Sequence, residues 1–124
     1  RRKALFEVAN RFGCTKVAFG HHKDDIVETI LMNMFFQGEI SAMLPKQELF
    51  GGKVVLIRPL AYVEEDMIIR FAKEADFPHH KCACPNSQAS SRTKVGNIIS
   101  ELKKTCPDVK TNIFRSVKRI KKDS

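Results

Sequence analysis

The amino-acid sequence predicts an α/β fold in which a parallel sheet is flanked by helices and followed by a helical carboxyl-terminal tail. Segments with helical spacing of apolar residues alternate with two short apolar runs, at 15–20 and 54–57. The last quarter of the chain shows helical spacing alone. Buried strands that alternate with helices are typical of parallel sheets covered on both faces.

The amino-terminal region reads as a helix followed by a strand. Apolar side chains of residues 1–12 recur on one helical face, at Leu5, Val8, Ala9 and Phe12. Gly13 stands where a helix C-cap is expected. Residues 15–20 read as a short buried strand. We expect the next helix to begin at Asp25, which forms a capping-box pattern with Glu28 three residues later.

The rest of the chain reads as a loop, a strand and three helices. Residues 37–53 contain glycines and a proline and read as a loop, and 54–57 form a β-branched run that predicts a strand. Helices are expected at 64–75, 92–104 and 109–121. Their inward-facing side chains would be Met67, Ile68, Phe71 and Ala72, then Val95, Ile98, Ile99 and Leu102, then Ile113, Phe114, Val117 and Ile120.

Two strands are few for a stable sheet, and the chain opens inside a helical pattern without a methionine. We therefore expect further strands before residue 1. The 43% hydrophobic content excludes a wholly disordered chain. No apolar run approaches the roughly 18–20 residues that cross a bilayer, and no signal peptide is visible, so no membrane association is expected.

The net charge of +8 is concentrated near the carboxyl end. Residues 1–91 carry 12 basic and 11 acidic side chains, whereas residues 92–124 carry 10 basic and 3 acidic ones. This asymmetry indicates a polyanionic partner, and nucleic acid is the leading candidate because phosphate neutralisation drives its binding. A solvated basic surface without a partner is the alternative.

A polar segment joins the first predicted strand to the following helix, at Gly20, His21, His22, Lys23, Asp24 and Asp25. Ligands of open α/β sheets bind at this edge. Gly20 allows a tight turn and the close approach of a ligand. Asp25 would cap the helix, which leaves Asp24 and the two histidines for a ligand. A capped turn without a ligand is the alternative.

Arg58 and Pro59 follow the second strand at the same edge of the predicted sheet. Pro59 ends the strand and fixes the turn. The planar guanidinium of Arg58 suits a phosphate, and a surface arginine at a strand end is the alternative.

The four cysteines do not have the spacing of a small secreted disulfide framework, which favours a reducing, cytoplasmic setting. Cys82 and Cys84 lie one residue apart and follow His79 and His80. Such side chains suit zinc or part of an iron–sulfur cluster. A loop with two unbound cysteines is the alternative, because C-x-C is not the usual C-x-x-C. The isolated Cys14 and Cys106 are interpreted as structural or incidental.

The helix expected at 109–121 would pack its apolar stripe inward and expose its basic residues, namely Lys110, Arg115, Lys118, Arg119, Lys121 and Lys122. These cations are suited to nucleic-acid phosphates.

Taken in order, these segments resemble the tRNA 2-thiocytidine synthetases, a family of the PP-loop ATPase superfamily. Residues 20–25, with Glu28-Thr29 and 31–35 after them, resemble the GHHxDD segment of that family, and 57–62 resemble its IRPLAY segment. The third cysteine region of the family is matched in spacing by Phe77-Pro78, Cys82 and Ser87-Gln88. The resemblance covers roughly residues 1–120.

The resemblance implies a partial Rossmann-like fold of the adenine nucleotide alpha hydrolase type. Residues 1–91 would be the carboxyl-terminal part of a PP-loop nucleotide-binding domain, and 92–124 a basic helical tail of the same unit. In that family, ATP adenylates the carbonyl of a tRNA base, and sulfur then replaces the activated oxygen. The family's PP-loop, Ser-Gly-Gly-Lys-Asp-Ser, and its C-x-x-C do not occur in these 124 residues.

The resemblance also implies cofactors and partners. The cofactors would be ATP, Mg²⁺ and an iron–sulfur cluster of the 4Fe-4S type, with zinc as the alternative to the cluster. The partners would be tRNA and a sulfur donor such as a cysteine desulfurase, with a homodimer as one candidate assembly.

Site residues carry over by position. Gly20, His21 and His22 would contact the nucleotide, and the catalytic residues would be Asp24, Asp25 and Arg58. Cys82 would bind the cluster, with Cys84 as the other candidate because Pro85 replaces a second cysteine found in some members. The tRNA contacts would be Arg115, Lys118, Arg119 and Lys122.

Two other functions fit the same sequence. One is the related 2-thiouridine branch, with the same chemistry on another base. The other is a non-catalytic, zinc-containing module that binds nucleic acid. Lysidine synthetases share similar motifs, but the segment with Cys82 and Cys84 argues against them.

Overall fold

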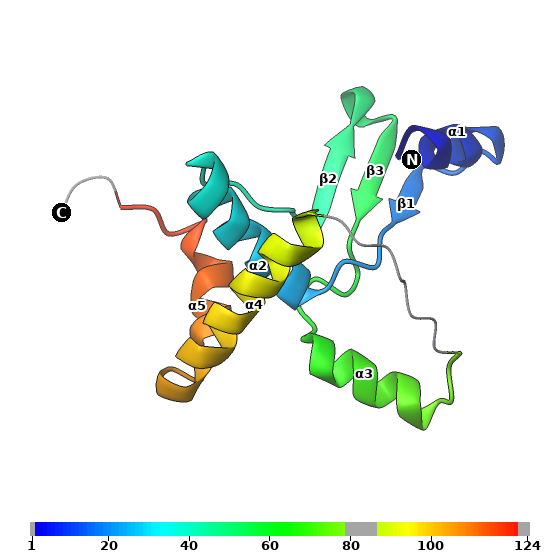
Figure 1. The fold of residues 1–124 in the computed structure, drawn as a ribbon. Helices are drawn as coiled ribbons and strands as arrows, with labels where there is room; N and C mark the ends of the chain where they lie inside the picture. The colour runs from blue at the N-terminus through cyan, green and yellow to red at the C-terminus, as the bar shows by residue number, and fades with distance from the viewer. Residues whose placement is uncertain (1, 79–86, 122–124) are drawn as a thin grey trace.

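The computed structural model describes residues 2–78 and 87–121. Its elements, in chain order, are α1 (Arg2–Arg11), β1 (Lys16–Ala18), α2 (Lys23–Met32), a π-helical turn (Asn33–Gln37), β2 (Lys46–Leu49), β3 (Val54–Ile57), α3 (Glu65–Glu74), α4 (Ser87–Thr105) and α5 (Val109–Ser116). Figure 1 shows a small sheet beside a cluster of helices, with α3 below them. The expected α/β class is thus confirmed.

The sheet has the strand order β1-β3-β2. β1 and β3 are parallel, with Lys16 opposite Val55 and Ala18 opposite Ile57. This pairing brings the carboxyl ends of both predicted strands to one edge, as the sequence indicated.

β2 corrects the expected loop over 37–53, because it pairs antiparallel with β3, with Lys46 opposite Ile57. A tight turn over Phe50–Gly52 joins the two strands, and Gly51 and Gly52 have φ of 68° and 90° there. Residues 46–49 are mostly exposed at the sheet edge and therefore lack the apolar run that marks a buried strand.

α2 begins two residues earlier than expected. His22 is its N-cap and accepts a hydrogen bond from the Asp25 amide, while the Asp25 carboxylate accepts one from the His22 amide. The predicted capping box between Asp25 and Glu28 is therefore wrong, because Asp25 occupies the third helical position, where the reciprocal partner of a cap stands.

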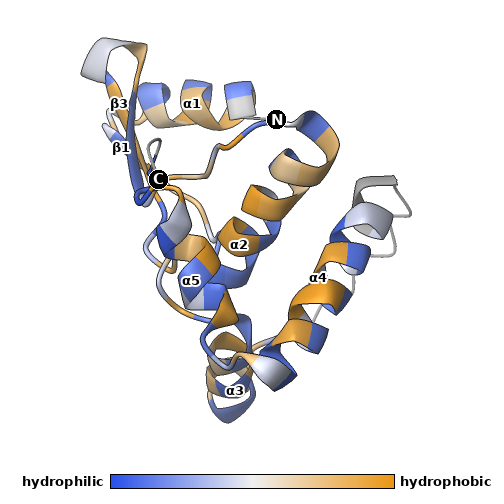
Figure 2. Cartoon of the chain, turned by 90° about the vertical axis from the view of Figure 1, so that its left-hand side faces the viewer, coloured by the Kyte–Doolittle hydropathy of each residue, from blue (hydrophilic) through white to orange (hydrophobic). Residues whose placement is uncertain are grey.

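The core lies among α2, α4 and α5 rather than under the sheet. Val27 and Leu31 of α2 pack with Val95 and Ile99 of α4 and with Val109 of α5. Figure 2 shows the hydrophobic stretches along α2 and α4. A second group joins α2 to the loop after β3, through Ile26, Ile30 and Ala61. Val95 and Ile99 thus confirm two of the predicted inward positions.

The predicted cover of both sheet faces is wrong within the described residues, where β1 and β2 stay largely exposed. Other predicted inward positions are wrong as well. Ile98 and Leu102 of α4 are 44% and 49% exposed, and Ile120 beyond α5 is 53% exposed. α4 meets α2 and α5 along a narrow stripe, so residues beside that stripe reach water.

α3 follows the expected range closely, but its apolar side is largely uncovered. Met67 and Phe71 are 61% and 62% exposed, against the prediction that both face inward. A helical repeat reports which residues share a face, and the neighbouring elements decide whether that face is buried.

The last two helices differ in length from the prediction. α4 begins at Ser87 instead of 92 and runs without a break through 91 and 92. α5 ends at Ser116 instead of 121. No helix in the described part of the chain combines the length and the hydrophobicity that crossing a membrane demands.

Candidate functional site

Two loops meet at the carboxyl edge of the parallel strands. The Phe19 amide donates to the Ile57 carbonyl at 2.9 Å, and the Lys23 amide donates to the Val63 carbonyl at 2.9 Å. The loops 19–25 and 58–65 therefore form one hydrogen-bonded edge. These loops contain the two segments that the sequence places at the ligand-binding edge of an α/β sheet.

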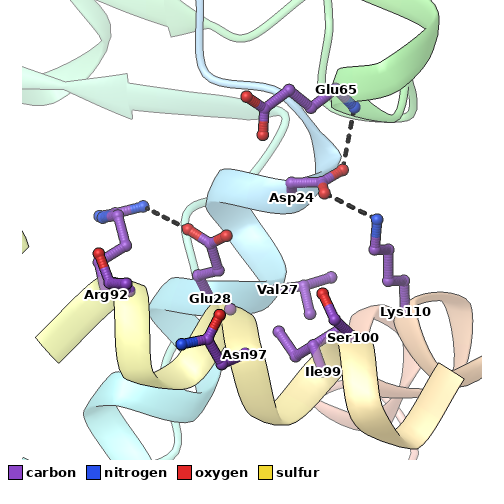
Figure 3. A pocket seen from close by; sticks show the side chains of 11 residues that line it. Asp24, Val27, Glu28, Glu65, Arg92, Asn97, Ile99, Ser100 and Lys110 are labelled. Atoms are coloured by element: carbon purple, nitrogen blue, oxygen red, sulfur yellow. Dashed lines mark hydrogen bonds and ion pairs between the residues drawn. The ribbon is translucent and has the colours of Figure 1, made fainter.

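Asp24 joins three helices at this edge (Figure 3). Its carboxylate accepts a hydrogen bond from the Glu65 amide at 3.0 Å, at the start of α3, and one from Lys110 of α5 at 2.8 Å. Its side chain is only 12% exposed. Burial alone would raise the pKa of Asp24, but the Lys110 and Glu65 hydrogen bonds and the Lys110 charge outweigh it and lower the pKa. Asp24 is therefore an anion at neutral pH.

Lys110 corrects the expectation that it faces water with the other tail cations. Its side chain is 17% exposed, and it pairs with Asp24 at 2.8 Å and with Glu64 at 3.5 Å. Burial would lower the pKa of Lys110, but the two carboxylates outweigh it and raise the pKa. Helical spacing gives no sign of this role, because its partner Asp24 lies far away in the sequence.

Asp25 is held from two sides. The His22 amide donates to one carboxylate oxygen at 3.0 Å, and Arg92 of α4 lies 3.5 Å from the other. Arg92 also pairs with Glu28 at 3.3 Å. Burial and the charges of Asp25 and Asp24 raise the pKa of Glu28, and together they outweigh the charge and the hydrogen bond of Arg92, which lower it.

A pocket of about 460 Å³ lies between α2 and α4, beside these charged groups (Figure 3). Asp24, Glu28 and Lys110 line one part, and Arg92, Asn97 and Ser100 line the α4 side. Sequence reasoning did not single out Arg92. The sequence carried no signal for it, because its partners Asp25 and Glu28 lie more than 60 positions away.

Arg58 is buried, with 4% exposure, so the alternative of a surface arginine at the strand end is wrong. Its Nη1 donates to the Leu44 carbonyl at 2.6 Å, and its Nε donates to His21 Nδ1 at 3.3 Å. His21 also lies edge-on to Phe19, with 5.6 Å between ring centroids. Arg58 therefore orients His21 and joins the edge to the segment before β2.

Gly20 is exposed and does not have the positive φ found at other glycines of the described residues. A tight left-handed turn is therefore not the reason for glycine here. A Cβ at Gly20 would meet no atom of the described residues within 4 Å, so the space beside it is open to a ligand.

Three of the predicted tRNA contacts gather on one surface. Arg115, Lys118 and Arg119 are exposed and line a groove of about 530 Å³, together with Lys23 and Tyr62. Sequence reasoning did not assign Lys23 or Tyr62 to this surface. Lys122 lies outside the described residues.

The predicted metal ligands Cys82 and Cys84, with His79 and His80, lie outside the described residues. In the parts that are described, no group of three or more histidine, cysteine or acidic side chains is placed to hold a metal ion. Cys14 and Cys106 are free thiols.

The family model of the PP-loop domain matches residues 1–102. A tRNA-cytidine(32) 2-sulfurtransferase of Verminephrobacter eiseniae is 43% identical over 121 residues, which are 97% of this chain and 38% of that protein. Its counterpart in Geobacter sulfurreducens is 42% identical over 119 residues, or 94% of this chain and 46% of that protein.

Among solved structures, the U34-tRNA thiolase NcsA from Methanococcus maripaludis, with its 4Fe-4S cluster, superposes with a TM-score of 0.77 at 29% identity. The match covers all of this chain and 43% of that one. The chain thus spans less than half the length of these relatives. Since the domain match takes in most of the sequence, the chain belongs to the PP-loop domain family.

Proposed function

We propose that this chain forms the carboxyl-terminal part of an ATP-dependent tRNA sulfurtransferase that makes 2-thiocytidine. The observation that carries the proposal is the junction of the loops 19–25 and 58–65 at one sheet edge. These loops contain the segments by which the sequence resembles the 2-thiocytidine family. Relatives with the tRNA-cytidine(32) 2-sulfurtransferase name match nearly the whole chain.

The proposed reaction has two steps. The carbonyl oxygen of the base attacks the α-phosphorus of ATP, and pyrophosphate leaves. A sulfur nucleophile then attacks the activated carbon, and AMP leaves with the former carbonyl oxygen. ATP would bring Mg²⁺, and a separate donor such as a cysteine desulfurase would supply the sulfur.

Asp24 is the proposed orienting anion of the site. Lys110 and the Glu65 amide keep its carboxylate ionised and fixed. A carboxylate has about four acceptor positions, so Asp24 can still accept a hydrogen bond from a substrate N–H or hydroxyl. Asp25 is fixed by the His22 amide and Arg92, and we propose a second contact of this kind there.

The nucleotide is proposed to lie against Gly20, His21 and His22. The open space at Gly20 allows close approach to the backbone. His21 is oriented by Arg58, so Arg58 is proposed to act through His21 rather than by direct contact with a phosphate.

An iron–sulfur cluster is proposed on Cys82, with Cys84 as the other candidate ligand and zinc as the other candidate metal. The 4Fe-4S cluster in the structure of the NcsA neighbour supports the cluster over zinc. Residues 92–124 are proposed to form the tRNA-binding tail of the same unit, and a second copy of the chain is a candidate partner. The cytoplasm is the proposed location, because tRNA is the substrate and Cys14 and Cys106 are free thiols.

The 2-thiouridine branch is the second candidate function. It is favoured by one observation, the TM-score of 0.77 with a protein named as a U34-tRNA thiolase. The higher identity of the cytidine enzymes makes 2-thiocytidine the first choice.

A chimera can test the proposal. This chain would replace the matching part of the Geobacter sulfurreducens sulfurtransferase, in a strain that lacks its own tRNA-cytidine(32) 2-sulfurtransferase. Mass spectrometry of tRNA nucleosides would measure 2-thiocytidine and 2-thiouridine. The unaltered Geobacter protein is the positive control, and the chimera with Asp24→Ala is the matched negative control.

We expect 2-thiocytidine from the chimera and none from its Asp24→Ala variant. New 2-thiouridine instead would favour the second candidate. A folded, expressed chimera that forms neither nucleoside would favour the non-catalytic nucleic-acid-binding module.

A further inference from the structure

The groove that Arg115, Lys118 and Arg119 line also contains an exposed aromatic ring. We call it the Tyr62 groove, after the residue from the loop that follows β3. Its volume is about 530 Å³. α5 and the turn after it form one wall, and the start of α2 contributes Lys23. Its lining residues are Lys23, Tyr62, Thr111, Phe114, Arg115, Lys118 and Arg119.

The groove is positively charged. Four of its seven lining residues are cationic, and none is acidic. Within residues 2–78 and 87–121, these four cations take part in no ion pair. Lys23 is held at the wall by a hydrogen bond of 2.7 Å to the Thr111 hydroxyl. A groove with these charges is complementary to a phosphate backbone.

Tyr62 is 66% exposed and nevertheless supported from one side. Its ring centroid lies 5.4 Å from that of Phe114, which packs into the core group of Ile26, Ile30 and Ala61. The aromatic ring is therefore braced by the core and open to solvent. An exposed aromatic ring among cations is typical of surfaces that bind unpaired nucleotides, because the ring stacks on a base and the cations hold the phosphates.

The groove adjoins the candidate site. In α2, Lys23 lines the groove and its neighbour Asp24 lines the pocket. In α5, Thr111 lines the groove and its neighbour Lys110 lines the pocket. An RNA strand in the groove would therefore pass beside the loop that carries Asp24.

We propose that the Tyr62 groove binds an unpaired nucleotide of the RNA substrate, with its base stacked on Tyr62 and its phosphates held by Lys23, Arg115 and Lys118. This inference rests on the proposed function, since it takes RNA as the substrate. It adds a selection for single-stranded over double-stranded RNA, which the tail cations alone do not provide.

The test compares Tyr62→Leu with Tyr62→Phe in the full chain. The first change removes the ring, and the second removes only the hydroxyl and serves as the matched control. Binding would be measured by fluorescence anisotropy with an RNA hairpin that has an unpaired loop and with a blunt duplex of equal length. A 2-aminopurine in the hairpin loop would report stacking by quenching of its fluorescence.

We expect Tyr62→Leu to weaken hairpin binding roughly 5- to 100-fold, with little change in duplex binding or in the salt dependence. The quenching should disappear in Tyr62→Leu and persist in Tyr62→Phe. Circular dichroism should be alike for all three proteins, since Tyr62 is exposed. Unchanged hairpin affinity, or an equal loss for hairpin and duplex, would overturn the proposal.

The binding assay needs no sulfur transfer, so it separates this inference from the proposed function. If the chimera forms no thiolated nucleoside, the chain can still bind the hairpin more tightly than the duplex, and the proposed function fails while the groove proposal stands. A thiolating chimera whose Tyr62→Leu variant keeps full hairpin affinity would reject the groove alone.

Discussion

Asp24 and Lys110 are separated by 86 positions in the sequence and by 2.8 Å in the structure. Asp24 also bonds to the Glu65 amide, so one carboxylate links the starts of α2, α3 and α5. Both side chains are largely removed from water, and charges in such surroundings are costly unless they are paired. The same ion pair therefore stabilises the fold and keeps Asp24 ionised for the proposed chemistry.

Lys110→Met should raise the pKa of Asp24 and lower the free energy of unfolding at pH 7 by about 1–3 kcal/mol. Asp24 would keep its burial and lose its cation. Because the folded-state pKa of Asp24 is lowered, its stabilising contribution is present above the unfolded pKa of about 3.9 and is lost as pH falls through the folded pKa. The difference in free energy of unfolding between the variant and the unsubstituted chain should therefore shrink below about pH 4. Urea unfolding at several pH values measures this.

Lys104→Met is the matched control for Lys110→Met. Lys104 pairs with Glu101 at 3.1 Å, but both side chains are 75% exposed. Water screens such a pair, so the change should cost less than about 0.5 kcal/mol. Equal destabilisation by the two substitutions would contradict the role assigned to Lys110.

Cys82 and Cys84 allow a second test at the scale of single residues, in the chimera. Cys82→Ala should abolish the iron bound after anaerobic reconstitution, because the spacing to Ser87-Gln88 aligns Cys82 with the third cysteine of the family. Cys84→Ala should lose less iron, and Cys14→Ala little. A greater loss of iron with Cys84→Ala than with Cys82→Ala would identify Cys84 as the ligand. Bound zinc in place of iron would favour a zinc site.

At the scale of elements, α5 and the turn after it divide their side chains between packing and charge. Ile113, Phe114 and Val117 pack against the core, whereas Arg115 and Lys118 are exposed. Changing Arg115, Lys118 and Lys122 together to Gln should weaken tRNA binding and flatten its salt slope by about two to three units. Titrations at several salt concentrations measure both. The fold should survive, because the Arg115 and Lys118 side chains are exposed.

Lys46→Gln, Arg70→Gln and Lys73→Gln together form the control, since these exposed cations lie outside residues 92–124 and do not line the Tyr62 groove. If the α5 variant and this control bind tRNA equally well, with the salt slope of the unsubstituted chain, the tail is only a solvated basic surface.

The elements that bury a repeating apolar pattern were predictable from the sequence. β3 was expected at 54–57, and α2 was expected from its run of Ile26, Ile30 and Leu31. β2 was missed because an exposed edge strand needs no apolar alternation. The start of α2 was missed because the cap is a histidine, outside the usual set of Ser, Thr, Asp and Asn.

Long-range partners were beyond the sequence. It placed the two loops at one edge, because parallel strands with apolar runs end there. It did not predict that Arg58 turns inward to Leu44 and His21, or that Lys110 reaches Asp24. These contacts depend on which elements pack together, and the periodicity of a single sequence does not predict that.

At the scale of the whole molecule, the charged residues around Asp24 and the Tyr62 groove lie on either side of the start of α2. The chain supplies an ionised carboxylate, an open glycine and a basic surface. Within residues 2–78 and 87–121, the strand-to-helix loops after β1 and after β3 contain neither a glycine pair nor the PP-loop sequence Ser-Gly-Gly-Lys-Asp-Ser. The pair Gly51-Gly52 lies instead in the turn between β2 and β3.

Residues 1–124 alone should therefore neither hydrolyse ATP nor adenylate RNA. Backbone amides and the lysine of a PP-loop provide most of the binding of the ATP phosphates, and Ser-Gly-Gly-Lys-Asp-Ser does not occur in this sequence. Pyrophosphate release should stay at background for the 124-residue chain and rise with tRNA for the chimera, whose Geobacter part is expected to supply that loop. Circular dichroism and a cooperative unfolding transition of the same preparation show that the chain is folded. ATP-dependent pyrophosphate release from the chain itself would mean that its own residues hold the nucleotide phosphates, and Lys53 beside Gly51-Gly52 would be the first residue to replace.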